Sequence, residues 1–289
     1  MLVAKLSCVG CFLVSFALVS PLQAAEQWKQ AYENGAWNIK QSNFECRLSQ
    51  RLVGVAEVSL QREPEHATKL ILALEHPDAA ATQAAVRIQN ADWKKDVDRV
   101  NPTLASGQFV DSKVEFFDIG SEVLDAIAAG DWLSFAYLQH EQHKNVVFTN
   151  TRGADAVIQF RQCLSAMAPI SWTTARESEF YFSTGKSTIS SAQDLALLQN
   201  IVRYISLDRN VTKVLIDGYT DNVGNNTANR VLSQQRADDV ASRLVEYGMD
   251  SSLLEVRAHG SRYPVINNKT LEQGLNRRVT VRLIRKNNG

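Results

Sequence analysis

Hydrophobic and polar residues follow different patterns on the two sides of about residue 168. In the first half, short runs rich in Val, Leu, Ile and Phe alternate with polar turns, a pattern typical of β-strands. We expect strands at residues 52–60, 70–74, 86–89, 113–119, 132–138 and 146–149. Residues 26–168 therefore predict a β-rich domain of the sandwich or barrel-like kind.

Two helices are expected among these strands. Residues 121–129 begin with Ser121, a residue type that caps helix N-termini, and end at Gly130. Residues 154–167 place Val157 and Phe160 on one side, as an amphipathic helix does. Ala168 and Pro169 follow this helix and indicate a domain boundary.

The second half, residues 169–289, follows a strand–helix order. A short strand is expected at 179–182, and then a helix that starts after Ser191, with Asp194 in capping-box spacing. We expect its apolar face to consist of Leu195, Leu198, Val202 and Ile205.

A buried strand at 211–219 and a long helix ending at Gly248 come next, followed by strands at 254–258 and 279–284. The order βαβαββ predicts an α+β domain with a mixed sheet and both helices on one face.

The first 25 residues have the pattern of a secretory signal peptide. Lys5 precedes an uncharged run over residues 6–19, and Pro21 and the small residues Ala24 and Ala25 follow it. This run is short for a helix that crosses about 30 Å of hydrocarbon, so we expect export and cleavage, with an uncleaved anchor as the alternative. The mature protein would then lie in the periplasm.

The charge of the chain argues against nucleic acid as a partner. Thirty-one Lys and Arg balance 31 Asp and Glu over 289 residues, so the basic excess that polyanion binding needs is absent. Residues 1–169 hold 15 basic and 19 acidic side chains, whereas residues 170–289 hold 16 and 12. This asymmetry suggests two units with different partners.

Two cysteines, Cys46 and Cys163, remain after removal of the signal peptide. In an oxidising compartment one disulfide is expected, and two buried free thiols are the alternative. Their wide separation excludes a CxxC redox motif, and the lack of clustered histidines argues against a zinc site.

A polar loop between the buried strand and the long helix carries the main candidate chemistry. Asp221 lies in this loop and can hold an ammonium group, whereas Arg236, about two turns into the helix, can bind a carboxylate through two N–H donors. Backbone N–H groups at the helix N-terminus also favour an anion. Together these groups suit a zwitterion, and the alternative is that Asp221 caps the helix and forms a solvated ion pair with Arg236.

Several motifs around this loop resemble the OmpA-like domain that binds peptidoglycan. The motifs are GYTDNVG at 218–224, Asn229, LSQQRA at 232–237, Gly260 and NRRV at 276–279, and the resemblance covers roughly residues 175–286. It implies that Asp221 and Arg236 recognise the amino and carboxylate groups of meso-diaminopimelate in the stem peptide. The positions that match residues lining or supporting the same pocket are Thr220, Asn229, Leu232 and Arg278.

The first half resembles the N-terminal domain of MotY-type flagellar motor proteins. The resemblance lies in Trp37, the string FECRL at 44–48, Gly54 and the late Cys163 directly before an OmpA-like domain. It implies that this domain joins a MotX-type partner and the outer rings of the flagellar basal body, in a ring oligomer called the T ring. It also implies a role in incorporating and holding the sodium-driven, PomA/PomB-like stator.

No motif for catalysis is present in the sequence. The histidines of His140-Glu141-Gln142-His143 are three positions apart, whereas the zinc-protease motif HExxH needs four, and no G-x-S-x-G, Walker or G-x-G-x-x-G motif occurs. We therefore expect neither an enzyme nor a bound metal or cofactor. Two further readings remain: a general OmpA-type tether between envelope and peptidoglycan, unrelated to motility, and a wall hydrolase, for which Asp221 lacks a paired carboxylate.

Overall fold

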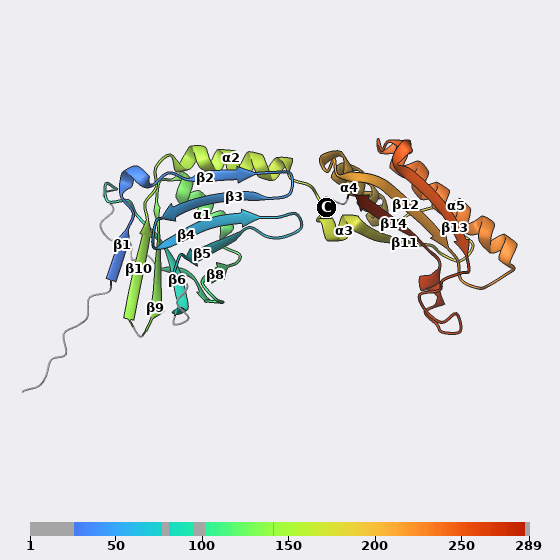
Figure 1. The fold of residues 1–289 in the computed structure, drawn as a ribbon, viewed down its shortest axis with the longest axis horizontal. Helices are drawn as coiled ribbons and strands as arrows, with labels where there is room; N and C mark the ends of the chain where they lie inside the picture. Colours follow the sequence, from blue (N-terminus) through green and yellow to red (C-terminus); the bar gives the residue numbers. More distant parts are fainter. Residues whose placement is uncertain (1–25, 77–80, 95–101, 141, 287–289) are drawn as a thin grey trace, which may run out of the picture.

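The computed structural model describes residues 26–76, 81–94, 102–140 and 142–286. The expected signal peptide, residues 1–25, lies outside the described residues. The chain forms two units joined near residue 168 (Figure 1).

The first unit contains two five-stranded sheets. One has the order β1-β10-β9-β6-β7, formed by β1 (Glu26–Lys29), β6 (Ala81–Gln89), β7 (Thr103–Gln108), β9 (Trp132–Gln139) and β10 (Gln142–Phe148). The other has the order β2-β3-β4-β5-β8, formed by β2 (Asn38–Gln41), β3 (Cys46–Leu52), β4 (Ala56–Arg62), β5 (Lys69–Leu74) and β8 (Lys113–Phe116). Both sheets contribute to one hydrophobic core. Among the described strands, each sheet has two edge strands that pair on one side only. The β-rich prediction is confirmed, in the form of a sandwich and not of a closed barrel.

One predicted strand, residues 52–60, was wrong because it contains a turn. Strand β3 ends at Leu52 and β4 begins at Ala56, and Val55 N donates to Leu52 O over 3.0 Å between them. Gly54 has a φ of +78°, which glycine adopts without steric cost. The apolar residues beside Gly54 conceal this turn, because Val53 is 80% exposed although its type suggests a strand interior.

Two helices, α1 (Gly120–Ala128) and α2 (Gly153–Ala166), accompany the sheets. Helix α2 packs along β2 and β3 (Figure 1). Both helices were predicted to within one residue at each end, but the expected N-cap at Ser121 was wrong. The N-cap is Ile119, which makes no side-chain cap bond, and Ser121 already lies inside the helix. The helix begins at Gly120, where a larger residue would not fit, because a Cβ there would lie 2.9 Å from the Thr68 Cβ.

The second unit has a four-stranded mixed sheet of order β11-β14-β12-β13. Its elements are α3 (Trp172–Arg176), β11 (Glu177–Tyr181), α4 (Ala192–Leu207), β12 (Val211–Tyr219), α5 (Asn226–Glu246), β13 (Leu254–Gly260) and β14 (Arg278–Arg285). Strand β12 runs parallel to β13 and antiparallel to β14, and α4 and α5 share one core with the sheet. The predicted βαβαββ order and mixed sheet are confirmed, whereas α3 was not expected.

The apolar face of α4 differs from the prediction. The Ser191 side chain accepts a hydrogen bond from Asp194 N over 3.3 Å, as the capping pattern requires. The fully buried residues of the helix are Leu198, Ile201 and Tyr204, whereas Leu195, Val202 and Ile205 are only partly buried. The helix is therefore rotated from the predicted face, because Tyr204 also contacts the first unit.

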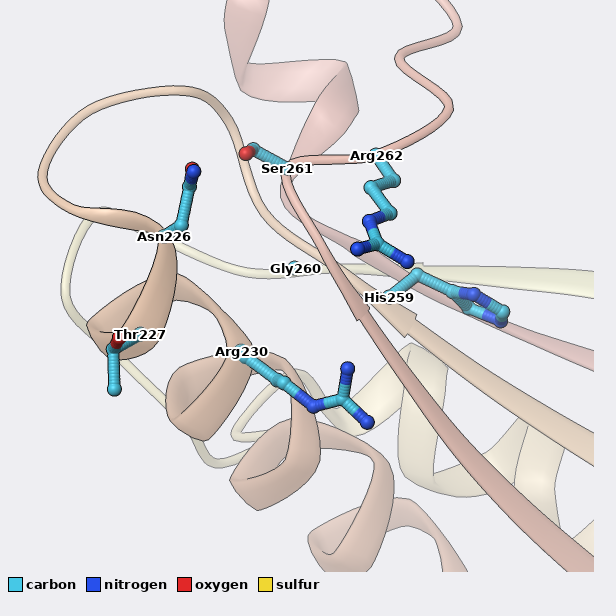
Figure 2. A pocket seen from close by; sticks show the side chains of 7 residues that line it. All are labelled: Asn226, Thr227, Arg230, His259, Gly260, Ser261 and Arg262. Atoms are coloured by element: carbon cyan, nitrogen blue, oxygen red, sulfur yellow. The ribbon is translucent and has the colours of Figure 1, made fainter.

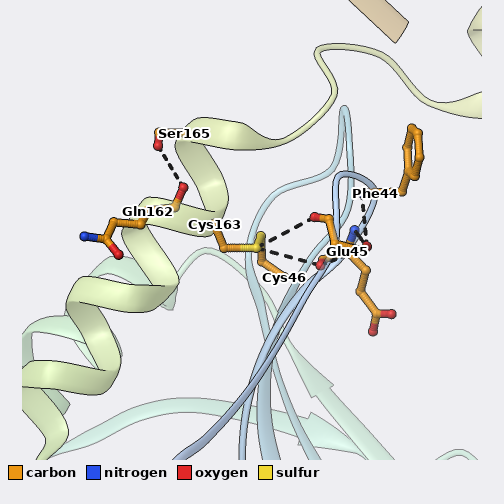
Figure 3. The surroundings of a disulfide bond; sticks show 7 residues. Phe44, Glu45, Cys46, Gln162, Cys163 and Ser165 are labelled. Carbon is orange, nitrogen blue, oxygen red and sulfur yellow. Dashed lines mark hydrogen bonds between the residues drawn. A yellow bond between two sulfur atoms is a disulfide. The ribbon is translucent and has the colours of Figure 1, made fainter. Parts of the chain in front are cut away.

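Cys46 and Cys163 form the predicted disulfide, with 5.9 Å between their Cα atoms (Figure 3). The bond joins the first residue of β3 to the last turns of α2. The turn that precedes Cys46 contacts the second unit: the Phe44 ring lies 5.1 Å from the Tyr204 ring, and Asn43 Nδ2 donates to Leu207 O over 3.4 Å.

A second contact between the units involves Glu65. Its carboxylate accepts hydrogen bonds from Ser171 N (3.0 Å) and Thr174 Oγ1 (2.8 Å). These bonds lower the pKa of Glu65 although its partial burial acts to raise it. The two units are thus held together by side chains as well as by the connecting chain. Within the described ranges, no helix combines the length and apolar character needed to cross a membrane.

Candidate functional site

The end of β12 and the start of α5 are held together by backbone contacts of three motif residues. Gly218 packs so tightly on α5 that a Cβ there would lie 2.2 Å from Ser233 O. The Ser233 hydroxyl donates to Arg230 O (2.8 Å) and accepts from Gly260 N (3.0 Å). Gly260 O in turn accepts from Thr220 N over 2.8 Å. The motifs GYTD, LSQQRA and Gly260 therefore meet at one place and fix the residue that follows, Asp221.

The carboxylate of Asp221 lies at this junction and is 7% exposed. One oxygen, Oδ1, accepts from Val223 N over 3.3 Å, and the other, Oδ2, accepts from the Arg277 guanidinium over 3.0 Å. Asn229 Nδ2 donates to the backbone oxygen of Asp221 over 3.4 Å. The direct ion-pair partner of Asp221 is therefore Arg277, a residue that was not among the expected site residues.

Arg236 lies fully buried beneath this junction. Its guanidinium donates to Lys186 O (2.8 Å), Tyr219 O (3.2 Å) and Ser183 O (3.4 Å), and it lies 5.1 Å from the Phe182 ring. Burial lowers the pKa of Arg236 to about 10, while the nearby charge of Asp221 raises it, so the side chain stays cationic at neutral pH. Three of the five N–H donors of the guanidinium bond to backbone oxygens and the side chain is 0% exposed, so Arg236 ties the surrounding loops together and adds positive charge beneath Asp221.

Of the other expected site residues, Thr220 precedes Asp221 in the chain and Asn229 bonds to it, whereas no contact between Leu232 and Asp221 is seen among the described residues. Thr220 is 2% exposed, and its Oγ1 has no hydrogen-bond partner among the described residues. Asn229 is buried, and Leu232 lies half-buried on the next turn of α5. An unpartnered buried hydroxyl beside a carboxylate is a ready hydrogen-bonding group for a bound polar ligand.

Arg278 lies apart from Asp221. Its guanidinium stacks 4.1 Å from the Tyr219 ring centre, and its Nε is 3.3 Å from Glu179 Oε1. Successive side chains of extended backbone point to opposite sides, so of the pair Arg277-Arg278 only one can face Asp221. The signal for Arg277 was present in the NRRV motif, but the sequence does not show which of the two arginines faces the loop.

Asn276, also in this motif, fixes the loop before β14. It is fully buried, and its Oδ1 accepts from Val265 N (2.8 Å) and Ile266 N (3.2 Å). Its Nδ2 donates to Ile266 O (2.9 Å) and Asn268 Oδ1 (2.8 Å). This amide has all its main partners inside the protein, so its role is to hold the loop in place.

A second buried acid near the site, Asp217, lies on the face of the sheet opposite to α5. Asp217 is 1% exposed and bonds to His259 Nε2 (2.8 Å) and Arg282 (2.6 Å). Burial acts to raise the pKa of Asp217, but these hydrogen bonds outweigh it and hold the pKa below the usual range. The His259 ring stacks on Tyr219 with 4.8 Å between centroids.

The arrangement at Asp221 suits a ligand that carries both a positive and a negative group. The two carboxylate oxygens have acceptor capacity beyond the bonds from Val223 and Arg277, so an ammonium can bind there. Arg277, whose side chain is 20% exposed, can supply N–H donors for a carboxylate, and the buried charge of Arg236 favours an anion at the same place. Within the described residues, no group of three metal-ligating side chains is present, and Glu141 of the HEQH string lies outside them.

Two protein families match the chain. Residues 28–169 match the MotY N-terminal domain, and residues 181–278 match the OmpA family. Among curated proteins, the probable lipoprotein YiaD of Escherichia coli is 44% identical over 73 residues, which are 25% of this chain and 33% of that protein. The outer-membrane lipoprotein YfiB of Pseudomonas aeruginosa is 42% identical over 72 residues, which are 25% of this chain and 43% of that protein. The chain thus spans less than half the length of these two relatives.

Solved structures also resemble the chain. The peptidoglycan-associated lipoprotein from Burkholderia pseudomallei is 27% identical with a TM-score of 0.35, covering 37% of this chain and 89% of that one. The C-terminal domain of Helicobacter pylori MotB is 25% identical with a TM-score of 0.35, covering 38% of this chain and 87% of that one.

The mixed βαβαββ sheet, the interlocked motifs and the family match define the second unit as an OmpA-like domain. Joined to a β-rich unit that matches the MotY N-terminal domain, it places the chain in the family of MotY-type proteins with an OmpA-like domain. This combination supports a role in peptidoglycan binding in association with the flagellar motor.

Proposed function

We propose that the chain is a periplasmic component of the flagellar motor that holds peptidoglycan with its second unit and the flagellar basal body with its first. The first unit binds a MotX-type partner and the outer rings of the basal body, and several copies form the T ring. In this position the protein helps to incorporate and anchor the sodium-driven, PomA/PomB-like stator. The expected signal peptide and the name of one relative, the outer-membrane lipoprotein YfiB, support a periplasmic location.

The observation that carries the wall-binding part is the cluster of Asp221, Arg277 and Arg236 at the end of β12. In the proposed complex, the ammonium of meso-diaminopimelate binds Asp221 and its carboxylate binds the guanidinium groups. Thr220 supplies its unpartnered hydroxyl, and Asn229 and Leu232 support the loop. Arg278 acts indirectly, because it packs on Tyr219, whose backbone oxygen binds Arg236.

The joint between the units fits a mechanical role. A rotating motor exerts torque on its stator, and the reaction must be carried by an immobile structure, which in the envelope is the peptidoglycan. Phe44, Asn43 and Glu65 of the first unit contact the second unit directly. Force can therefore pass between the units through side-chain contacts and not only through the chain near residue 168. In a ring, several modest wall affinities combine through effective concentration.

Sedimentation with purified sacculi tests the wall-binding site. We expect Asp221→Asn to abolish co-sedimentation, because the neutral amide loses the attraction for an ammonium while keeping the shape of the side chain. Arg236→Ala should have the same effect, but the buried guanidinium also ties Lys186 and Ser183, so circular dichroism must accompany it. Asp238→Asn, an exposed residue of α5, is the matched control. Undiminished sedimentation of Asp221→Asn would refute the site.

Co-purification with detergent-extracted basal bodies tests the motor part. We expect the protein to remain with basal bodies from wild-type cells, detected by immunoblotting. Absence from basal bodies, together with normal motility of a deletion strain, would instead favour a general envelope tether. We further propose that the protein is not an enzyme, so the purified chain should release no muropeptides from sacculi.

A further inference from the structure

A second polar cavity lies beside the proposed wall site. Its volume is about 280 Å³, and it is lined by Asn226, Thr227, Arg230, His259, Gly260, Ser261 and Arg262 (Figure 2). It lies between the first turns of α5 and the end of β13, and Figure 2 shows the side chains of Arg230 and Arg262 reaching toward the same space.

The lining of this cavity is positively charged and lacks a balancing acid. No acidic residue is among its lining residues, and neither the Arg230 nor the Arg262 guanidinium forms a hydrogen bond or ion pair within the described part of the chain. The first N–H groups of a helix have no partner inside the helix, so the start of α5 adds to the positive potential. Two guanidinium groups that share a cavity without a counter-charge favour an anion between them.

The walls of the cavity are fixed in place. His259 is held by Asp217 through its Nε2 and by stacking on Tyr219. Gly260 forms part of the lining, and its backbone N–H donates to the hydroxyl oxygen of Ser233 over 3.0 Å. Arg230 and Arg262 are exposed long side chains without a partner in the described part of the chain, so they can adjust to a ligand.

The cavity and Asp221 lie on opposite sides of one backbone contact. Thr220, the residue before Asp221, donates its amide to Gly260 O, and Gly260 lines the cavity. On α5, Asn229 bonds to Asp221, whereas the next residue, Arg230, lines the cavity. A ligand held at Asp221 can therefore place a neighbouring anionic group in the cavity.

We propose that the cavity between Arg230 and Arg262 binds a second carboxylate of the same peptidoglycan stem peptide, the free α-carboxylate of its γ-linked D-glutamate. This inference rests on the proposed wall-binding function. Because the D-glutamate is joined to diaminopimelate through its γ-carboxyl group, its α-carboxylate is free and lies next to the residue that Asp221 is proposed to bind. The cavity thus binds the D-glutamate of the stem peptide, whereas Asp221 binds the neighbouring diaminopimelate.

Calorimetric titration of the mature chain with two muropeptide fragments tests this assignment. One fragment carries the free D-glutamate α-carboxylate, and the other carries the corresponding amide. The wild type should bind the free acid about tenfold more tightly, since a charge-assisted hydrogen bond is lost in the amide. The double variant Arg230→Gln/Arg262→Gln should bind both fragments equally, at the affinity that the wild type has for the amide.

Arg209→Gln is the control for a change in surface charge, because Arg209 is an exposed arginine at the opposite end of β12 and its loss removes one of the two charges that the double variant removes. It should keep the tenfold preference, and Arg230→Lys/Arg262→Lys should keep part of it. Both variant positions are exposed, so thermal melts should match the wild type.

The outcomes separate the two proposals. Equal binding of both fragments by the wild type, with loss of binding in Asp221→Asn, overturns the cavity assignment and leaves the wall site standing. No binding of either fragment overturns both. Inorganic phosphate is a further probe, and its binding would shift the NMR resonances of Arg230 and Arg262 Nε. If phosphate binds but the protein shows no preference between the two fragments, the cavity is a general anion site and the stem-peptide assignment is wrong.

Discussion

Removal of the disulfide between Cys46 and Cys163 should strongly destabilise the first unit. The bond closes a segment with a sequence separation of 117 residues, from the start of β3 to the last turns of α2. Both cysteines are buried, with 0% and 4% exposure, so the double variant Cys46→Ala/Cys163→Ala adds no buried polar group. The main effect of this change is on the unfolded chain, which gains freedom when the link is lost.

The size of the effect follows from loop-closure entropy. For a closed loop of this length, the chain-entropy model gives a stabilisation of about 5 kcal/mol at 25 °C. With a urea dependence of roughly 2 kcal/mol/M for a unit of this size, the unfolding midpoint should fall by about 2.5 M. A secondary effect is expected at the joint, because the turn before Cys46 carries Phe44 and Asn43, which contact the second unit.

Urea unfolding followed by tryptophan fluorescence measures this change. Four of the five tryptophans, Trp28, Trp37, Trp93 and Trp132, lie in the first unit, so the signal reports mainly on it. Amide hydrogen exchange at Ala168, whose N–H donates to Asn43 O over 2.8 Å, reports on the joint and should become faster.

A reducing agent supplies the control. It should lower the midpoint of the wild type to that of the double variant and leave the variant unchanged. A midpoint shift that corresponds to less than about 1 kcal/mol would refute the reasoning, because the unfolded state would then gain little freedom from losing the bond.

Two further predictions concern the second unit. Gly218→Ala should destabilise this unit by more than about 2 kcal/mol in thermal unfolding, because the new Cβ would lie 2.2 Å from Ser233 O. Gly185→Ala is the control: Gly185 has a φ of +68° and open space around it, so this change should cost only about 1 kcal/mol. Because the pKa of Asp217 is lowered in the folded protein, its stabilising effect is present above the usual carboxyl range near 3.8 and is lost as the pH falls through the lowered value. Arg282→Gln removes one cause of the lowered pKa, so stability should fall less steeply with acid than in the wild type. Unfolding midpoints measured over a pH series test this. If the midpoints of the wild type and the variant fall in parallel as the pH decreases, this account is wrong.

Local patterns in the sequence determined much of the fold. The strand at Val211–Tyr219 was predicted with its observed bounds, because a run of apolar residues between polar loops has few alternatives. The cap at Ser191 and the turn at Gly248, with a φ of +101°, follow from the chemistry of single residue types. The pairing of Cys46 with Cys163 followed from there being only two cysteines after residue 25.

The tertiary structure decided how these elements meet, because contacts between distant segments depend on register and rotation. The sequence brings Asp221 and Arg236 into one motif region, but the alternation of side chains at the start of β14 gives Asp221 the partner Arg277. Helix α4 turns Tyr204 toward Phe44, a residue 160 positions earlier in the chain, which no local periodicity indicates. The cavity of Arg230 and Arg262 likewise forms where the end of β13, at Gly260 with a φ of +62°, lies against the first turns of α5, segments that are about 30 positions apart in the chain.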